Sequence, residues 1–343
     1  MINNLSYKKI LIIKWGALGD MIMSTSAIRA VRENYPEAYI TLLSNSLMTQ
    51  ILPQGTIVDE IIIYDEKKYS GIKSFIELIK LVLVLRRKKY DLAINLRWTS
   101  DRCAVITYLS GAKERVSSGP KNMMSLYTIK LDHPVGRYHE LHRNLDIVKA
   151  VGMKVNNEVP YIFISEANKR FADNFFNQSK LRREKTVLIH PGASKPNRAW
   201  SPEKYKEIAL RLVKEFDLNV IVTWGNNELD WASKVADGMN HKIILASATS
   251  SIGDLAALIK NSALCITNCT GPMNVAVATE TPTIAFLGSS HPVDWGPYFS
   301  IHTVIKSPMD QETYTDEEER MAMEAISIEM AWDVIKKKVE DFL

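Results

Sequence analysis

KILIIKWGALGD, residues 9–20, contains the order of elements that decides the fold. After Lys9, the run ILII is apolar and mostly β-branched, which predicts a strand buried on both faces. Gly16 and Gly19 follow this strand and allow a tight turn that brings the backbone close to a ligand. Residues 21–34 then show the apolar pattern of a helix. A strand, a glycine turn and a helix in this order begin a parallel α/β unit.

The alternation of strand and helix occurs twice along the chain. The expected strands are nearly continuous in apolar residues, as in parallel sheets that helices cover on both faces. They lie at residues 9–15, 39–45, 59–65, 90–96 and 114–118, and again at residues 186–192, 219–225, 242–248, 263–268 and 283–288. Helices are expected at residues 21–34 and 72–88, and at residues 202–215, 228–239, 252–260 and 273–279. We therefore predict an α/β protein of two Rossmann-like domains whose parallel sheets face each other across a cleft.

The 343 residues are enough for two domains rather than one very large core. We place the first domain at residues 1–165 and the second at residues 166–315, because strand-like YIFIS gives way there to a polar helix start. Residues 316–343 read as a helix whose acidic start and basic end suit the helix dipole. We expect this helix to pack back on the first domain.

The composition is that of an ordinary globular protein, with 46% hydrophobic and 24% charged residues. The N-terminal apolar run is too short for a signal peptide, and charged residues interrupt the most apolar stretch, at 72–85, so it does not span a membrane. The three cysteines show no CxxC pair, and neither a disulfide framework nor a zinc site is indicated. We expect a cytoplasmic protein with no cofactor, no metal and no nucleic-acid partner.

The charge is distributed unevenly between the two halves. Residues 1–165 carry 23 Lys and Arg against 15 Asp and Glu, whereas the remainder carries 20 against 24. The basic first half could meet an anionic partner, although chance variation of the surface explains the difference equally well. Residues 86–89, RRKK, could lie against the anionic inner face of the cytoplasmic membrane. A solvated helix end with basic residues is the simpler interpretation of this run.

The first candidate motif runs from Lys14 to Asp20, between the first strand and the first helix. Asp20 could be a general base, or it could cap the helix that follows, and spacing alone favours the cap. The motif lacks the third glycine of a dinucleotide fingerprint, and no acidic residue ends the second strand at 42–45. An NAD site is therefore not expected here.

Three further loops follow strands of the second half. In HPGAS and RAWSP, Gly192, Ser194, Lys195 and Arg198 could hold phosphate oxygens, although an ordinary surface loop would look the same. Residues 268–274, NCTGPMN, place small residues between a strand and a helix start, which is a ready anion site. Here Thr270 and Gly271 could bind a diphosphate, although a turn without a ligand is an equally good interpretation.

The remaining loop contains His291 and Trp295. Trp295 could form a wall for a base or sugar, although an interior tryptophan is the simpler expectation. His291 has no matching base or nucleophile, so we do not predict a triad. DxD, GxxxxGK[ST] and HExxH motifs do not occur, and a donor site made of helix N-termini and basic side chains can stabilise a leaving diphosphate without a metal.

In this order and at these separations, the motifs resemble glycosyltransferase family 9, the heptosyltransferases that build the lipopolysaccharide inner core. The resemblance rests on KILIIKWGALGD (9–20), HPGAS (190–194), RAWSPEKY (198–205), TGPMNVA (270–276), and TPTIAFLG with WGPY (281–298). It implies a GT-B fold, an acceptor-binding first domain and a second domain that binds a nucleotide sugar. It also implies metal-independent, inverting transfer from ADP-heptose to an anionic glycolipid or glycan acceptor.

The resemblance assigns roles to individual residues. It makes Asp20 the general base toward the acceptor hydroxyl, which reverses the preference for a helix cap. The donor phosphates would meet Ser194, Arg198, Thr270 and Gly271, followed by Pro272 and Met273 of the same motif. Candidate contacts to the sugar or base are Lys14, which could face the cleft, and Gly19, Cys269, Asn274, His291 and Trp295.

Two residues depart from the family pattern. Where the family reads Asp-[Ser/Thr]-Gly-Pro-Met-His, this chain has Cys269 and Asn274. The aspartate is expected to contact the donor sugar, and a thiol does not replace the two acceptors of a carboxylate. Either the donor sugar differs from heptose, another group substitutes, or activity is weak. Two alternatives therefore stay open. The first is a transferase with another donor sugar or with a protein or capsular acceptor, and the second is a non-catalytic relative that binds sugar nucleotides. The missing GxGxxG motif disfavours an NAD-linked or epimerase-type enzyme.

Overall fold

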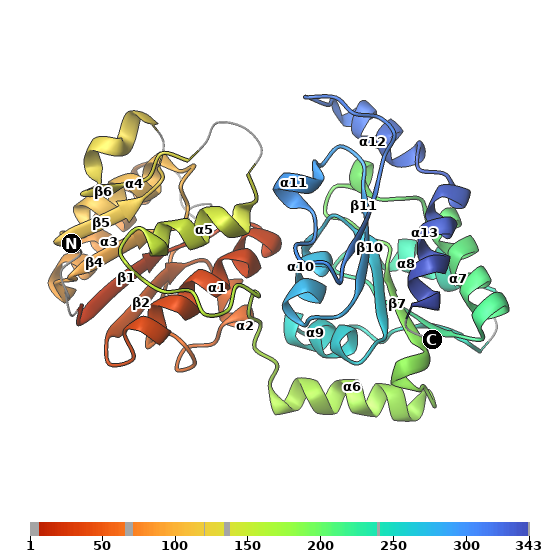
Figure 1. Cartoon of the computed structure of the whole chain (residues 1–343). Coiled ribbons are helices and arrows are strands. Elements are labelled where there is room, and N and C mark those ends of the chain that lie inside the picture. The colour runs from red at the N-terminus through yellow and green to blue at the C-terminus, as the bar shows by residue number, and fades with distance from the viewer. Residues whose placement is uncertain (1–6, 66–70, 120, 134–137, 239–240, 342–343) are drawn as a thin grey trace. The chain divides into compact units, whose positions relative to one another are not determined.

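The computed structural model describes residues 7–65, 71–119, 121–133, 138–238 and 241–341. The chain divides into two compact units, Met1–Phe163 and Ile164–Leu343, each built on one parallel sheet with helices (Figure 1). Within the described residues, no helix is long and apolar enough to cross a membrane.

The first unit contains a six-stranded parallel sheet in the order β3-β2-β1-β4-β5-β6. Its strands are β1 (Lys9–Ile13), β2 (Tyr39–Ser44), β3 (Glu60–Ile63), β4 (Leu92–Asn95), β5 (Glu114–Ser117) and β6 (Ile129–Lys130). Its helices are α1 (Leu18–Asn34), α2 (Met48–Ile51), α3 (Gly71–Lys88), α4 (Asp101–Leu109) and α5 (Glu140–Lys149), with a 3₁₀ turn at Lys121–Leu126. Residues 10–13 of the central strand are fully buried, as expected for a sheet covered on both faces.

The second unit repeats this design in the strand order β12-β11-β10-β7-β8-β9, again with parallel neighbours. Its strands are β7 (Thr186–His190), β8 (Asn219–Val222), β9 (Ile243–Leu245), β10 (Leu264–Asn268), β11 (Thr283–Leu287) and β12 (Thr303–Lys306). Its helices are α6 (Glu166–Gln178), α7 (Pro202–Phe216), α8 (Leu229–Ala236), α9 (Ile252–Lys260), α10 (Gly271–Ala278), α11 (Pro292–Trp295), α12 (Asp316–Glu324) and α13 (Ile328–Glu340), with 3₁₀ turns at Arg183–Lys185 and Pro196–Arg198.

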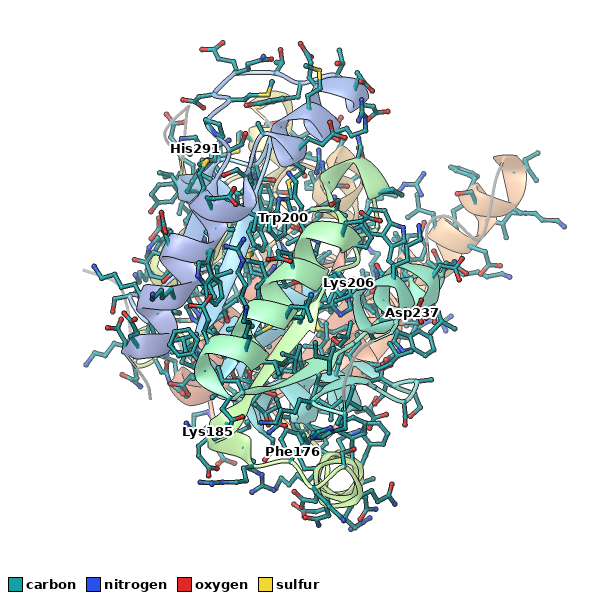
Figure 2. All side chains as sticks on the ribbon, turned by 90° about the vertical axis from the view of Figure 1, so that its right-hand side faces the viewer. Phe176, Lys185, Trp200, Lys206, Asp237 and His291 are labelled. Carbon is teal, nitrogen blue, oxygen red and sulfur yellow. The ribbon has the colours of Figure 1, made fainter. Side chains whose placement is uncertain are left out.

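An aromatic cluster forms the part of the second core that lies nearest the expected donor loops. Trp200 stacks on Phe286 of β11 with ring centroids 4.3 Å apart, and Tyr205 of α7 packs edge-on against both. Figure 2 shows Trp200 inside the unit, while Lys185, before β7, and His291, after β11, lie at opposite ends of it. The end marked by His291 is therefore the carboxyl end of the sheet, where open parallel sheets bind ligands.

The structure of the chain after β12 differs from the prediction for the C-terminal helix. Residues 316–343 were expected to form a single helix on the first domain, but the structure has α12 and α13, and both belong to the second unit. Ile335 and Val339 of α13 are fully buried in the core of that unit. The indole N–H of Trp200 donates to the carbonyl of Ile326, between the two helices, at 2.9 Å. Apolar burial and this bond fix the C-terminal helices to the sheet of their own unit.

The prediction of two α/β units with parallel sheets is confirmed. Every expected strand is present, and the structure adds β6 and β12 at the sheet edges. Both strands were missed because β6 has only two residues and β12, TVIK, is a short, partly polar edge strand. The chain passes between the units two residues before the predicted boundary, and Ser165 and Asn168 form a capping box at the start of α6 there.

Candidate active site

The strand order defines one binding position in each unit. In the first unit β1 lies between β2 and β4, so the chain leaves β1 toward one side of the sheet and later returns to the other. The loops after β1 and β4 therefore diverge at this point and leave a crevice at the carboxyl ends of the strands. In the second unit β7 lies between β8 and β10, so the loops after β7 and β10 diverge in the same way. The predicted motifs lie in the loops after β1, β7, β10 and β11.

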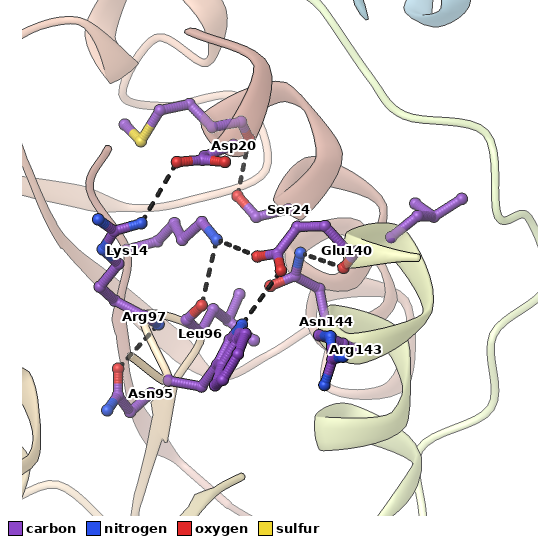
Figure 3. A network of polar contacts seen from close by, with 12 residues as sticks. Lys14, Asp20, Ser24, Asn95, Leu96, Arg97, Glu140, Arg143 and Asn144 are labelled. Carbon is purple, nitrogen blue, oxygen red and sulfur yellow. Dashed lines mark hydrogen bonds and ion pairs between the residues drawn. The ribbon is translucent and has the colours of Figure 1, made fainter. Parts of the chain in front are cut away.

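Asp20 lies in the first turn of α1, directly after the loop that follows β1 (Figure 3). Its Oδ2 is 3.3 Å from Nη1 of Arg97, which comes from the loop after β4. The cap position of α1 is held by Ala17, whose methyl side chain cannot accept a hydrogen bond. The helix-cap interpretation that spacing favoured is therefore wrong. The carboxylate instead forms an ion pair across the point where the two loops diverge, and it keeps 17% of its surface exposed.

Gly16 leaves the space that this ion pair needs. A Cβ built at this position would lie 2.8 Å from Oδ2 of Asp20 and 3.4 Å from Nη1 of Arg97. A contact of 2.8 Å is closer than carbon and oxygen tolerate, so any larger residue would push the carboxylate away. Gly19, the other glycine of the motif, lies in the first turn of α1 beside Asp20.

Lys14 lies inside the first unit rather than on an open face, contrary to the expectation. Its side chain is fully buried, and its ammonium group donates to the carbonyl of Leu96 and to Oε1 of Glu140, both at 3.1 Å (Figure 3). The second carboxylate oxygen of Glu140 accepts a hydrogen bond from the indole N–H of Trp98 at 3.1 Å. Lys14 and Glu140 thus fix the loop that carries Arg97.

Arg97, Trp98 and Glu140 were missed by sequence reasoning. The first two lie in LRWTS directly after the strand at 90–96, and the signal that identifies them is this position beside the first strand of the sheet. Glu140 comes from α5, far away in sequence, and its partnership with Lys14 could not be read from any local pattern.

In the second unit, Asn268 at the end of β10 connects the two predicted donor loops. Its amide nitrogen donates to the carbonyls of Pro191 and Gly192, at 2.8 and 3.2 Å. Its amide oxygen accepts from the backbone N–H of Trp200 and the hydroxyl of Tyr205, both at 3.0 Å. The side chain is fully buried, so all of these bonds form away from water. The HPGAS and CTGPM segments are therefore held in one fixed arrangement.

The start of α10 presents backbone donors at the same position. Thr270 is its N-cap residue, but its hydroxyl donates to the carbonyl of Asn268 rather than capping the helix. The N–H groups of Thr270, Gly271 and Met273 belong to the first turn, where helix geometry provides no carbonyl partner, and Pro272 carries no N–H. The side chain of Met273 packs against β11, and Asn274 donates to the carbonyl of Thr270 at 3.2 Å. The turn can thus offer three N–H groups and the helix dipole to an anion.

Arg198 is held by a carboxylate of its own unit. Its Nε lies 2.7 Å from Oε1 of Glu319 in α12, and its Nη2 contacts the same oxygen. The hydrogen bond from Arg198 lowers the pKa of Glu319 below its ordinary value. Asn197 donates to the other oxygen of Glu319 at 2.6 Å. Ser194 lies exposed in the same loop. The ion pair with α12 orients Arg198 and reduces the net charge that it can offer to a phosphate.

Cys269 occupies the position where the family usually has aspartate. Its Sγ lies 3.6 Å from the carbonyl oxygen of Trp295. Burial raises the pKa of the thiol to about 11, although Ser290 and the charge of Arg198 lower it in part. The thiol is therefore neutral at physiological pH and cannot act as the carboxylate would.

The loop after β11 carries the two remaining candidates, and the carbonyl of Trp295 contacts Cys269. His291 is the N-cap of α11, and its Nδ1 accepts from the backbone N–H of Val293 at 3.2 Å. Trp295 ends this helix with 43% of its surface exposed, so the expectation of an interior tryptophan is wrong.

Glu228, the residue before α8, is a further candidate that sequence reasoning missed. Its Oε2 accepts from the backbone N–H of Gly225 at 2.8 Å and lies 3.1 Å from Nε2 of His190. Burial raises the pKa of Glu228, but the bonds to His190 and Gly225 outweigh this and hold it below the ordinary value. A Cβ at Gly192 would lie 2.7 Å from Oε1 of Glu228, so this glycine makes room for the carboxylate. The available signal was an acidic residue after the second strand of the second half.

The part of the chain that the structure describes shows no group of three His, Cys, Asp or Glu side chains placed to hold a metal ion.

Comparison with known proteins identifies the family. The model of glycosyltransferase family 9 (heptosyltransferase) matches residues 78–325. Lipopolysaccharide heptosyltransferase 3 of Escherichia coli K12 is 24% identical over 296 residues, which cover 82% of each chain. The glycosyltransferase family 9 structure from Veillonella parvula superposes with a TM-score of 0.82 at 22% identity and covers 98% of each chain. The structure of E. coli heptosyltransferase WaaC with ADP gives 0.74 at 15% identity, covering 96% of this chain and 99% of that one.

The two parallel sheets and their helices are those of the GT-B glycosyltransferases. The chain belongs to glycosyltransferase family 9, the heptosyltransferase family, and is a glycosyltransferase. The resemblance drawn from the sequence motifs is thereby confirmed.

Proposed function

We propose that this protein is an inverting, metal-independent transferase that moves a heptose-like sugar from ADP-heptose or a related nucleotide sugar to a lipopolysaccharide-core or related glycan. The observation that carries the proposal is Asp20. Its carboxylate lies at the crevice of the first sheet, held by Arg97 and given space by Gly16, and it does not cap its own helix. A partly exposed carboxylate in this position is suited to accept a proton.

In the proposed reaction Asp20 takes the proton of an acceptor hydroxyl. The hydroxyl oxygen forms a bond to the anomeric carbon of the donor from the face opposite the leaving group, so the configuration inverts. The bond between that carbon and the diphosphate oxygen breaks, and the diphosphate leaves with the electron pair. We assign Arg97 to hold the Asp20 carboxylate in position through their ion pair, with Lys14 and Glu140 fixing the loop behind it.

The second unit would bind the donor. The first turn of α10 offers N–H groups of Thr270, Gly271 and Met273 to the diphosphate, and its dipole stabilises the charge that develops on the leaving oxygen. Ser194 and Arg198 would add a hydroxyl and a charged donor from the loop after β7. Asn268 supports this site because it sets the two loops relative to each other.

Glu228 supports a nucleotide donor in particular. In Rossmann-like sheets an acidic residue after the second strand accepts hydrogen bonds from ribose hydroxyls. Glu228 follows β8, the second strand of its unit, and lies directly against Gly192 of the donor loop. We favour an ADP-sugar because the related E. coli heptosyltransferase has been solved with ADP.

The sugar of the donor is the part most open to variation. A neutral thiol at Cys269 gives one weak donor and one weak acceptor, whereas a carboxylate would accept several hydroxyl bonds. This observation favours a second candidate, a family member with a donor sugar other than the usual heptose, for which a protein or capsular acceptor also stays open. A non-catalytic relative that binds sugar nucleotides is the remaining alternative.

The acceptor and the location follow from the relatives and the charge. Related lipopolysaccharide heptosyltransferases and the excess of basic residues in the first 165 positions support an anionic glycolipid acceptor. We propose a cytoplasmic protein that works at the inner face of the cytoplasmic membrane.

The donor proposal is tested by thermal unfolding without metal in the presence of ADP, UDP, GDP, CDP or NAD. A ligand that binds only the folded protein raises the melting temperature. ADP alone should do so, and Glu228→Gln should weaken the effect because an amide replaces one of the two acceptor oxygens. Stabilisation by a different nucleotide would contradict the ADP assignment. ADP binding without ADP release, from any ADP-sugar and acceptor, would favour the non-catalytic alternative.

A further inference from the structure

The outer face of α3 is an unusual surface for a water-exposed helix. Six of the sixteen large apolar side chains that the described structure leaves exposed lie on this one helix. Their exposed fractions run from 43% for Val84 to 79% for Ile72. Only Leu81 and Leu85 of α3 are buried, so one side of the helix packs on its unit and another presents apolar groups to solvent. Contiguous exposed apolar surface of this kind marks an interaction site.

The exposed apolar residues form a continuous stripe. Helical residues advance by about 100°, and positions three, four, seven and eleven apart share a face. Five of the six residues have this spacing and fall within roughly a 100° arc on a helical projection. They are Ile72, Phe75, Ile76, Ile79 and Leu83, and we call them the α3 stripe.

A row of basic residues borders the stripe along one side. Lys73, Lys80 and Arg87 lie seven residues apart, which keeps them on one line roughly 70–110° from the middle of the stripe. Arg86 and Lys88 add positive charge in the last turn. Glu77 is the one acidic residue of α3, and it pairs with Lys80 at 2.7 Å. The helix therefore combines apolar groups with a net positive charge.

This combination fits one kind of partner. An amphipathic helix that lies on a bilayer inserts its apolar face among the acyl chains and places Lys and Arg at the headgroups, where each basic residue adds to the attraction of anionic lipids. A protein interface would bury the apolar stripe equally well, but it would give no general reason for a basic border along the whole helix.

We propose that the α3 stripe and its basic border dock the protein on the surface of an anionic phospholipid bilayer. The biological reason for this attachment rests on the proposed function, because docking would hold the enzyme at the membrane in which a glycolipid acceptor is embedded. Its measurement requires neither donor nor acceptor, so the two proposals can fail separately.

The test is flotation of the full chain with vesicles of phosphatidylglycerol and phosphatidylethanolamine, and separately with phosphatidylcholine alone. The wild type should float with the anionic vesicles, bind less at high salt, and bind phosphatidylcholine weakly. Phe75→Glu with Ile79→Glu should lower partitioning at least tenfold, because two exposed side chains lose the gain of entering the apolar layer. Lys73→Gln with Arg87→Gln should lower binding to anionic vesicles about fivefold for each charge removed.

Leu210→Glu on α7 is the matched control, since it places the same charge at a helical apolar residue that is 40% exposed in the other unit. It should float like the wild type. All variants should have the melting temperature of the wild type and keep the stabilisation by ADP, because none of these residues lies at the candidate site. Failure of the wild type to float, or equal flotation of the Phe75/Ile79 variant, would overturn the proposal. A wild-type dimer that this variant makes monomeric, without a change in flotation, would instead assign the stripe to a second copy of the chain.

Discussion

Removal of the Asn268 side chain should destabilise the second unit and weaken donor binding together. Asn268→Ala takes away both acceptor bonds, to Trp200 and Tyr205, and both donor bonds, to Pro191 and Gly192. Each buried polar group left without a partner costs about 1–3 kcal/mol. With partial relaxation of the loops we expect the free energy of unfolding to fall by roughly 3–5 kcal/mol, from two or three groups left unpaired.

The assay is urea unfolding followed by tryptophan fluorescence. Five of the seven tryptophans, at positions 200, 224, 231, 295 and 332, belong to the second unit, so the signal reports mainly on it. Asn261→Ala is the control, because that partly buried side chain donates a single bond, to the carbonyl of Ala257 at 2.8 Å. It should cost about 1 kcal/mol.

The same two variants distinguish a general loss of stability from a specific loss of donor binding. Melting with and without ADP should show a smaller ADP-induced rise for Asn268→Ala than for Asn261→Ala, because only Asn268 joins the two donor loops. Asn268→Asp should behave like the alanine variant, since its carboxylate places an oxygen against two carbonyls. If Asn268→Ala unfolds within about 1 kcal/mol of the wild type, the role given to this residue is refuted.

Three further predictions test other parts of the account. Gly16→Ala should lower kcat at least tenfold and also lower the melting temperature, because its Cβ would meet Oδ2 of Asp20 at 2.8 Å and a φ of 157° is strained for alanine; an unchanged kcat in the folded variant would contradict the role of Gly16 in giving Asp20 space. Glu319 has a lowered pKa from its bond to Arg198, so its contribution to stability should be present above the unfolded pKa of about 4.3 and lost as pH falls through the lower folded value. The melting-temperature difference between wild type and Glu319→Gln should therefore be constant from pH 8 to about 5.5 and shrink below about pH 4, whereas a difference that grows on acidification would refute this. Cys269 should react with iodoacetamide far more slowly at pH 8 than an ordinary thiol, because its pKa is about 11, and rapid alkylation at pH 8 would show that it is not held neutral.

The fold could be predicted from the sequence because local and global signals agree. Strand runs such as ILII at residues 10–13 are apolar throughout, since both faces of a parallel sheet are buried, and the helices between the strands keep a helical spacing. The strands at the sheet edges gave no such signal, because β6 and β12 are short and only partly buried. The C-terminal segment was predicted as one helix on the first domain, whereas it forms two helices in the second unit, since no local pattern states which core will take up Ile335 and Val339.

The candidate site could be predicted only where residues belong to loops after strands. Asp20, Thr270 and Gly271 were named as candidates because a turn between a strand and a helix is visible in sequence. Arg97 and Glu140 were not, because their importance comes from contacts with residues 77 and 126 positions away. Buried ion pairs and hydrogen bonds of this kind depend on tertiary structure rather than on local pattern.

We assign Asp20 as the proton acceptor in the proposed glycosyl transfer, and the most direct test of this role is the kcat of Asp20→Asn against that of the wild type. ADP release would be followed with an ADP-sugar and a lipopolysaccharide-core acceptor, and thermal stabilisation by ADP would be measured in parallel. Asparagine keeps the shape of the side chain but cannot take the proton, so kcat should fall by about 10²–10⁴ while stabilisation by ADP stays as in the wild type. A variant that turns over within about tenfold of the wild type would contradict the assignment of Asp20 as the base.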